Sequence, residues 1–413
     1  MDTQEDKGTF YIYKNISLSD KILEKMKQYQ KIHFCRNFNK AVNNLPNNIT
    51  HIIFGYSFNQ PVDNLPTELK SVSFDYNFNQ KIDKLPKGLE KIKIMGIFNK
   101  SIDNLPENGL KKIKLKWNFN KNINKLPASL EKISFGCKFN KSVDNLFTSI
   151  PYGVEIKLHT IIFGTNFNKF VDNLPPSLKT LTFGKNFNKP VNNLPAGLKN
   201  LKFGIDFNQC VDNLPVGLES VYFDNNFNKQ INNLPKGLLK LYLGMEFNQP
   251  VDYLPYGLEY LEFAYYFNQP VNNLPSTIKY IKFGSCFNQP VDNLPQELET
   301  LIFGYSFNQS VNNLPSKVRD IIFEDNFNQK IDNLPEGLET INLGKNFNQS
   351  VDNLPNSLKN LSLDDDFNQP INKLPTGLKY LNISEEYGFS LEHLPPSISI
   401  NRYSKNFCNI KFD

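Results

Sequence analysis

The sequence predicts a repeat solenoid. Each coil of about 20 residues should contribute one short parallel strand and an irregular or polyproline-II return segment, with a cap at each end. The pair Phe-Asn occurs 17 times between residues 38 and 367, and fourteen of the 16 intervals are 20 residues long. Apolar residues recur at fixed places relative to this pair, and a proline follows at the ninth place in nearly every repeat.

The repeat has a strand at one end and no stable helix. Counted from the phenylalanine, the consensus is F-N-[QK]-x-[VI]-[DN]-N-L-P-x-x-L-x-x-[LI]-x-F-G-x-x. The fifteenth and seventeenth places, for example Leu181 and Phe183, have the spacing of strand residues that face the same side. The ninth-place proline and the seventh-place asparagine disfavour a helix between them. We therefore expect a strand, a corner at a glycine such as Gly184, and an extended return.

Two intervals are longer than the rest, and both fit loops. One has 21 residues, with an extra residue near Pro106, and one has 28, between Phe139 and Phe167. A stack of coils tolerates such insertions at its corners, and stacking is needed because one coil cannot bury its apolar edge alone.

The Phe-Asn pairs predict two columns along the stack. The phenylalanine rings should stack in the core, and the asparagine amides should form a structural ladder beside them. An amide both donates and accepts hydrogen bonds, so each asparagine can satisfy backbone groups of its own coil and the next. A repeated binding site is the alternative interpretation. The ladder includes Asn59, Asn79, Asn188, Asn208, Asn228, Asn248, Asn268 and Asn288.

The sixth place alternates between Asp and Asn from Asp172 to Asp332. Like charges on adjacent coils repel, so the alternation lowers a cost of stacking. It also fits duplication of a two-coil unit. A calcium-binding column is the functional alternative, but the Gly-rich nonapeptide of calcium β-helices is absent.

The pattern LPxxLxxLxFGxxFNxx[VI] closely resembles the FNIP repeat over about residues 31–386. That family belongs with the leucine-rich repeats and is found mainly in amoebae and in giant viruses that infect them. The resemblance implies a leucine-rich-repeat-like solenoid that binds other proteins. Some members carry an N-terminal F-box that recruits a ubiquitin ligase.

The first 30 residues depart from that arrangement. They predict a strand at 9–13 and one helix within 17–30, begun at Ser19 or Asp20. An F-box needs several helices, so we interpret 1–30 as a cap on the open end of the stack.

The solenoid should occupy 31–386, and residues 387–413 should form the second cap. There Tyr387-Gly388 replaces Phe-Asn, Asn401 falls at the place of a core leucine, and Phe407 ends the stack.

Composition predicts a monomeric protein of a reducing compartment, the cytoplasm. The five cysteines are odd in number and no two share a place in the repeat, which argues against a disulfide framework or a zinc site. The net charge of +5 is too weak to imply nucleic-acid binding. No run approaches about 18 apolar residues, so we expect no membrane contact, and the charged start lacks the apolar run of a signal peptide.

The outward strand places, fourteenth and sixteenth, and the corner places are free of the core. Early coils present Lys91, Lys93, Lys112, Lys114, Lys116, Trp117 and Lys132. Middle coils present Tyr222, Tyr242, Tyr260, Tyr265, Tyr266 and Tyr280. Late coils present Asp320, Glu324, Asp325, Asp364, Asp365, Asp366, Glu385 and Glu386.

These residues predict a partner-binding surface. Lysines stacked on adjacent strands do not help folding, and clustered tyrosines are typical of interface anchors. We expect the strand face to bind an extended protein partner, with an acidic part over the lysines. The alternatives are a solvated sheet whose charges have drifted, a substrate receptor of a ubiquitin ligase that lacks a recognisable F-box, and an expanded repeat array under weak selection with no dedicated partner.

Enzymatic interpretations have little support. Among four histidines, His33 and His51 lie on neighbouring coils, but a zinc site needs three or four protein ligands. No phosphate loop, nucleophile elbow or Cys-His arrangement is present. We therefore predict no catalysis, metal or cofactor. Nucleic acid over Lys91 to Lys132 with Trp117 is the weaker alternative, because it would need a longer basic stripe.

Overall fold

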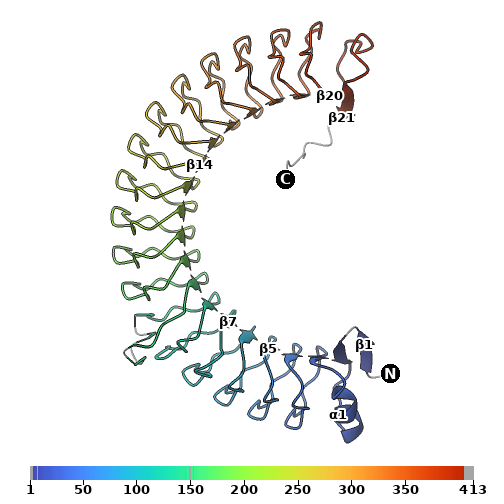
Figure 1. Cartoon of the computed structure of the whole chain (residues 1–413), viewed down its shortest axis with the longest axis vertical. Helices are drawn as coiled ribbons and strands as arrows, with labels where there is room; N and C mark the ends of the chain where they lie inside the picture. The colour runs from blue at the N-terminus through green and yellow to red at the C-terminus, as the bar shows by residue number, and fades with distance from the viewer. Residues whose placement is uncertain (1–2, 7, 145, 148–149, 152, 404–413) are drawn as a thin grey trace. The chain divides into compact units, whose positions relative to one another are not determined.

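The computed structural model describes residues 3–6, 8–144, 146–147, 150–151 and 153–403. The chain forms two compact units, residues 1–207 and 208–413. Each unit is a parallel solenoid with one short strand per coil, so the predicted fold class is confirmed. In each unit the strands follow the inner edge of the coils and the return segments lie outside (Figure 1).

The described part of unit 1 has one helix and eleven strands. These are β1 Thr3–Asp6, β2 Thr9–Ile12, α1 Asp20–Met26, β3 Lys31–Phe34, β4 His51–Ile53, β5 Ser71–Phe74, β6 Lys91–Ile94, β7 Lys112–Leu115, β8 Lys132–Ser134, β9 Thr160–Ile162, β10 Thr180–Thr182 and β11 Asn200–Lys202.

The described part of unit 2 has ten strands. These are β12 Ser220–Tyr222, β13 Lys240–Leu243, β14 Tyr260–Phe263, β15 Tyr280–Lys282, β16 Thr300–Ile302, β17 Asp320–Ile322, β18 Thr340–Leu343, β19 Asn360–Leu363, β20 Tyr380–Ser384 and β21 Ser399–Tyr403.

Strand pairing follows the repeat place for place. Leu181 of β10 pairs with Ile161 of β9 and Leu201 of β11, all at the fifteenth place. Parallel pairing in this register puts equivalent residues of successive coils side by side. Every outward residue of a strand therefore faces the outward residue at the same place of the next coil.

The core consists of columns of identical side chains. Leu181, Phe183 and Phe187 are each at most 3% exposed. The rings of Phe183 and Phe187 stack with centroids 3.6 Å apart, and Phe187 lies 6.1 Å from Phe167 of the previous coil. Such offset ring stacks add to the free energy gained from burial. The predicted phenylalanine column is therefore present in the core.

Turns replace a helix on the return side. The carbonyl of Pro195 accepts a hydrogen bond from the N–H of Leu198 at 3.0 Å, which closes a single turn after the proline. At the corner, a side chain on Gly184 would overlap the carbonyl oxygen of Gly164 in the previous coil. Close approach of two backbones explains the glycine of the eighteenth place.

The asparagine column forms a hydrogen-bonded ladder within each unit. In unit 1 the side-chain oxygen of Asn59 accepts the backbone N–H of Asn79 at 2.9 Å, and Asn79 accepts that of Asn99 at 3.0 Å. The N–H of Asn188 donates to Asn168 at 3.0 Å. In unit 2 the same bond, at 2.9–3.1 Å, is made by the side-chain oxygens of Asn208, Asn228, Asn248, Asn268 and Asn288.

The sixth-place aspartates also receive a bond from the next coil. The amide of Asn193 donates to Asp172 at 3.2 Å, and that of Asn273 donates to Asp252 at 3.0 Å. The seventh-place asparagine thus has a bonding role that the sequence pattern did not predict.

The first cap differs from the prediction in two ways. An additional strand, β1, pairs antiparallel with β2, which is the strand expected at 9–13. The helix is shorter than the expected 17–30, because the chain must rejoin the sheet. The carbonyl of Gln30 already accepts the N–H groups of Thr50 and His51, at 2.8 and 3.0 Å. Ser19 is the N-cap residue of α1, with extended backbone.

The prediction for Asn401 was wrong. The last coil is one residue shorter than the others, so Ile400 pairs with the core residue Leu381, and Asn401 pairs with the outward residue Asn382. Tyr387 does replace the core phenylalanine, because it is 6% exposed and stacks on Phe367 at 5.8 Å. Phe407 lies outside the described residues.

Within the described chain, no helix is long and apolar enough to cross a membrane.

Candidate functional site

Strands β6, β7 and β8 carry lysines that face one another directly. Lys91 pairs with Lys112, and Lys112 pairs with Lys132. Along the other outward row, Lys93 pairs with Lys114. The alternation between apolar and basic residues on these strands turns the isoleucines into the core and leaves the lysines outside. Like charges directly opposite in a sheet are destabilising, so folding does not account for this arrangement.

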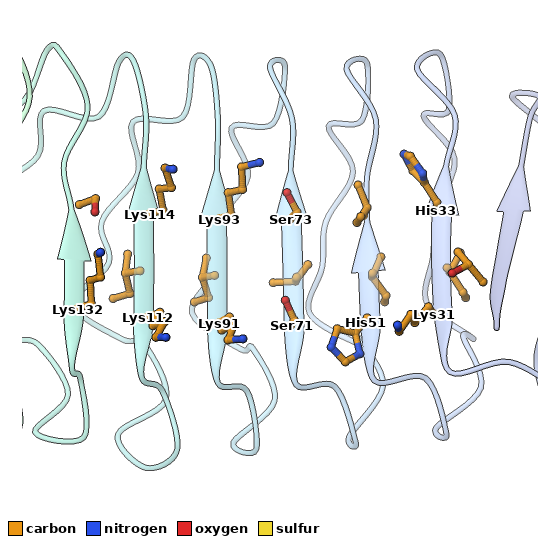
Figure 2. A pocket seen from close by; sticks show the side chains of 18 of the residues that line it. Lys31, His33, His51, Ser71, Ser73, Lys91, Lys93, Lys112, Lys114 and Lys132 are labelled. Carbon is orange, nitrogen blue, oxygen red and sulfur yellow. The ribbon is translucent and has the colours of Figure 1, made fainter. Parts of the chain in front are cut away.

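The lysines line a groove across the strand face of unit 1, with a volume of about 680 Å³. Figure 2 shows two rows of labelled side chains across the strands, one with Lys31, His51, Ser71, Lys91, Lys112 and Lys132, and one with His33, Ser73, Lys93 and Lys114. Its described lining contains no carboxylate. It contains three serines, which are Ser71, Ser73 and Ser134, and its basic residues are Lys31, His33, His51, Lys91, Lys93, Lys112, Lys114 and Lys132. We call this feature the basic groove.

The four central lysines have no acidic partner. Among the described residues, no carboxylate lies within ion-pair distance of Lys91, Lys93, Lys112 or Lys114. The neighbouring carboxylate of Glu90 instead accepts a hydrogen bond from Lys111 at 3.1 Å, which holds the pKa of Glu90 below its usual range. The groove therefore presents an excess of positive charge.

His51 responds electrostatically to that charge. Its Nδ1 lies 2.9 Å from the hydroxyl of Thr50. Partial burial lowers the pKa of His51, and the ammonium groups of Lys31 and Lys91 lower it further, against a smaller opposing effect of Glu90. The imidazole is therefore mainly neutral at neutral pH, and a bound anion would favour its protonation.

Two residues of the predicted partner-binding surface do not line the basic groove. Lys116 directly follows β7, and Trp117 occupies the corner with a φ of 59° and an exposed fraction of 52%. Neither belongs to the residues that line the basic groove.

Unit 2 carries a row of tyrosine rings on its strand face. Tyr222 and Tyr242 have centroids 5.6 Å apart, Tyr242 and Tyr260 are 4.9 Å apart, and Tyr260 and Tyr280 are 4.3 Å apart with nearly parallel rings. This tyrosine row, on β12 to β15, brings four of the six predicted tyrosines together.

The other two predicted tyrosines form a separate pair. Tyr265 and Tyr266 contact each other edge to face at 4.7 Å. They occupy the corner after β14 and are 46% and 45% exposed.

The tyrosine row has polar partners that sequence reasoning missed. The hydroxyl of Tyr260 donates to Glu262 at 2.9 Å, and the ammonium of Lys282 pairs with Glu262 at 3.1 Å. Burial and then the bond to Glu262 raise the pKa of Tyr260 far above its usual value. The signal was available, since Glu262 lies two places after Tyr260 and Lys282 occupies the same place one coil later.

The basic groove was also only partly found from sequence. The same outward places, one to three coils before Lys91 and Lys93, hold Lys31, His33, His51, Ser71 and Ser73. Reading those places back to the first coils would have found them.

Metal-binding groups are not seen in the described part of the chain. No cluster of three or more His, Cys, Asp or Glu side chains that could hold a metal is found there. His33 and His51 both line the basic groove, but His33 pairs with Ile53 and His51 pairs with Lys31, so they lie diagonally on their strands.

The acidic residues of the late coils are partly engaged within the fold. The hydroxyl of Tyr403 donates to Asp364 at 3.1 Å and to the carbonyl of Leu363 at 2.9 Å. Burial, followed by the neighbouring Asp325, raises the pKa of Glu324. Some of the acidic residues of the late coils therefore have contacts within the fold.

The repeat matches a known family of repeat sequences. The family model described as FNIP Repeat matches residues 38–64, 98–138, 211–246, 247–286, 287–326, 310–346 and 347–386, together more than half of the chain. No curated protein matches the sequence.

Solved structures with a similar fold include leucine-rich-repeat proteins. CroV588, a giant-virus protein described as a novel circular leucine-rich-repeat structure, is 32% identical with a TM-score of 0.64. That match covers 94% of this chain and 71% of CroV588. YopM from Yersinia enterocolitica is 18% identical with a TM-score of 0.47, covering 92% of this chain and 93% of YopM.

Proposed function

This chain belongs to the FNIP repeat family, and from that premise we propose that it is a non-enzymatic scaffold for protein–protein interaction. A partner would bind along the strand face. Leucine-rich-repeat-like folds are typical of interaction scaffolds, because stacked coils present long continuous surfaces.

One observation carries the proposal: the unpaired lysines that face one another on β6 and β7. Lys91 faces Lys112 and Lys93 faces Lys114, and none of the four lies within ion-pair distance of a described carboxylate. Opposed like charges cost folding free energy. A surface of this kind is explained when a partner supplies the missing opposite charge, since electrostatic complementarity sets partner choice and association rate.

The tyrosine row of unit 2 supports a second contact surface. Four half-buried rings on adjacent strands offer large apolar area with polar tips, which is the composition of interface anchors. This surface and the basic groove are independent candidates, each testable within its own unit.

The test is affinity capture from an amoebal lysate, followed by mass spectrometry. Three baits are compared: the intact chain, the groove variant Lys112→Glu/Lys114→Glu, and the control Lys81→Glu/Lys100→Glu. Lys81 and Lys100 are exposed and lie at the fourth and third places of their repeats, away from the strands, so the control changes the charge equally on another surface. A Tyr242→Ala bait tests the tyrosine row in the same way.

A protein captured by the intact chain and the control, and lost from the groove or tyrosine variant, supports the scaffold. Equal capture on all four baits, or no capture, overturns it. Ubiquitin-ligase adaptors on every bait, with one further protein lost from a surface variant, would instead support the substrate-receptor alternative. In the described part of residues 1–30, α1 is the only helix, with seven residues.

A further inference from the structure

We propose that the basic groove of unit 1 binds an acidic segment of a partner polypeptide, about seven residues long and extended across strands β3 to β8. This inference rests on the proposed scaffold function and names the chemistry of its ligand.

The charge of the lining requires an anionic ligand. Two parallel rows of side chains flank the groove, and both are basic on β6 and β7 (Figure 2). Lys31 and Lys132 extend the first row to β3 and β8. Because no carboxylate is among the described lining residues, no negative charge in the lining would repel a bound anion.

The dimensions fit a single extended polypeptide. Neighbouring strands are about 4.8 Å apart, so five steps from β3 to β8 span about 24 Å. An extended chain advances about 3.4 Å per residue, which gives about seven residues over that length. The two rows are two residues apart along each strand, about 6.6 Å, so side chains on both sides of one backbone can reach an ammonium group.

The groove is not uniform along its length. Positive charge is densest on β6 to β8, whereas β4 and β5 contribute His51, Ser71, Ser73 and Ile53, which is 47% exposed. The acidic residues of the ligand should therefore lie over β6 to β8. Polar or apolar residues of the same segment should lie over β4 and β5.

A nucleic acid fits these features less well. Single strands are held by aromatic platforms on which the bases stack, together with a long basic groove. The floor between the lysine rows is strand backbone, because Ile92 and Ile113 are each 2% exposed and turn into the core. The ring of Tyr11, at the groove's end, already packs on His33 at 5.4 Å. Beyond β8 the first row continues as Thr160 and Thr180, so the charge stops.

The experiment measures fluorescence anisotropy of labelled probes with the full chain at low salt. The probes are a peptide of Glu and Asp, its Gln and Asn counterpart of equal length, and an oligothymidylate of similar length. We expect the acidic peptide alone to bind measurably, and the groove variant Lys112→Glu/Lys114→Glu to weaken it about tenfold or more. The control Lys81→Glu/Lys100→Glu should change affinity less than about twofold.

Three results would overturn the inference: no binding of the acidic peptide, equal weakening by both variants, or tighter binding of the oligothymidylate. A Lys112→Gln/Lys114→Gln variant that melts like the intact chain excludes misfolding as the cause of lost binding. If the acidic peptide fails while lysate capture is still lost from the groove variant, the scaffold stands and only the ligand chemistry is wrong. If both fail, both proposals fall.

Discussion

The side-chain oxygen of Asn268 accepts the backbone N–H of Asn288 in the next coil at 2.9 Å. The same oxygen accepts the side-chain amide of Gln289 at 3.2 Å. One asparagine therefore satisfies two donors of its neighbour, so the ladder joins each coil to the next by polar bonds alongside the ring stack.

Removing that oxygen should loosen the stack. Asn268→Ala leaves a half-buried N–H without its acceptor, and we expect a loss of about 1 kcal/mol or more in the free energy of unfolding. Urea unfolding followed by circular dichroism measures it. Gln269→Ala is the control, because it removes a neighbouring amide and leaves the oxygen of Asn268 in place. Equal loss in both variants would contradict a special role of the ladder oxygen.

The ring column should tolerate truncation poorly. Phe187 is fully buried and stacks on Phe183 at 3.6 Å, so Phe187→Ala should cost about 3–5 kcal/mol of unfolding free energy. Phe170 of the same unit is 51% exposed and contacts Lys189 through its ring. Phe170→Ala should cost less than about 1 kcal/mol. Thermal melts of the two variants compare them directly, and similar melting temperatures would refute the stacked core.

The lysines of the groove should be dispensable for stability. Lys112 faces Lys91 and Lys132, so Lys112→Thr removes two like-charge contacts and introduces the residue found at this place in β9 and β10. We expect unchanged or slightly higher stability, by about 0.2–1 kcal/mol, together with weaker binding of the acidic peptide. A clear loss of stability at low salt would show that the lysines serve the fold.

The free energy of unfolding should fall as the pH is lowered, and His51 should contribute to this loss. Burial and the charges of Lys31 and Lys91 lower the pKa of His51 from 6.5, so the unfolded chain binds this proton more readily than the folded one. Folding therefore loses stability as pH falls through the ordinary histidine range. His51→Gln should show a shallower loss between neutral and mildly acidic pH.

The control for that experiment is His159→Gln, because His159 also contacts a neighbouring threonine hydroxyl, at 3.0 Å, but lies outside the groove lining. Melting temperatures are recorded at a series of pH values for the three proteins. The acidic peptide should bind more tightly as pH falls, and less so in His51→Gln, since a bound carboxylate favours the imidazolium. A steeper loss of stability in His51→Gln would contradict the assignment.

Three tyrosines of the row should ionise at unusually high pH. Burial comes first among the causes that raise the pKa of Tyr222, Tyr242 and Tyr260, and the charge of Glu262 contributes to each. Glu262→Gln should therefore lower these pKa values and shift part of the tyrosinate absorbance to lower pH in an alkaline titration. Glu246→Gln, outside the row, is the control. An unchanged titration curve would show that Glu262 does not act on the row.

The periodic part of the fold was predictable because every coil repeats the same constraints. Leu181 pairs with Leu201 and the ring of Phe183 stacks on that of Phe203, so each partner occupies the same place in the next coil. The ends were less predictable, since no neighbouring coil dictates their register. The short helix α1, the added strand β1 and the displaced Asn401 all lie there.

The sequence predicted which residues of the candidate site point outward, but not which side chains contact one another. Outward strand places follow from alternation, so Lys112 and Tyr260 could be named from the sequence. Which predicted residues line the groove and which lie at a corner depends on where the backbone turns, as it does at Trp117 with its positive φ. The bond between Tyr260 and Glu262 depends on rotamers, which periodicity does not determine.

The hydrogen bond of the asparagine ladder also forms between coils of different length. The N–H of Asn168 donates to the side-chain oxygen of Asn140 at 3.0 Å, although 28 residues separate them in place of the usual 20. The added residues leave the joint between coils unchanged. A gene encoding such coils could gain, lose or lengthen a unit by recombination without a matching change elsewhere. The same joint makes the longer interval before β9 a suitable place to graft a foreign peptide.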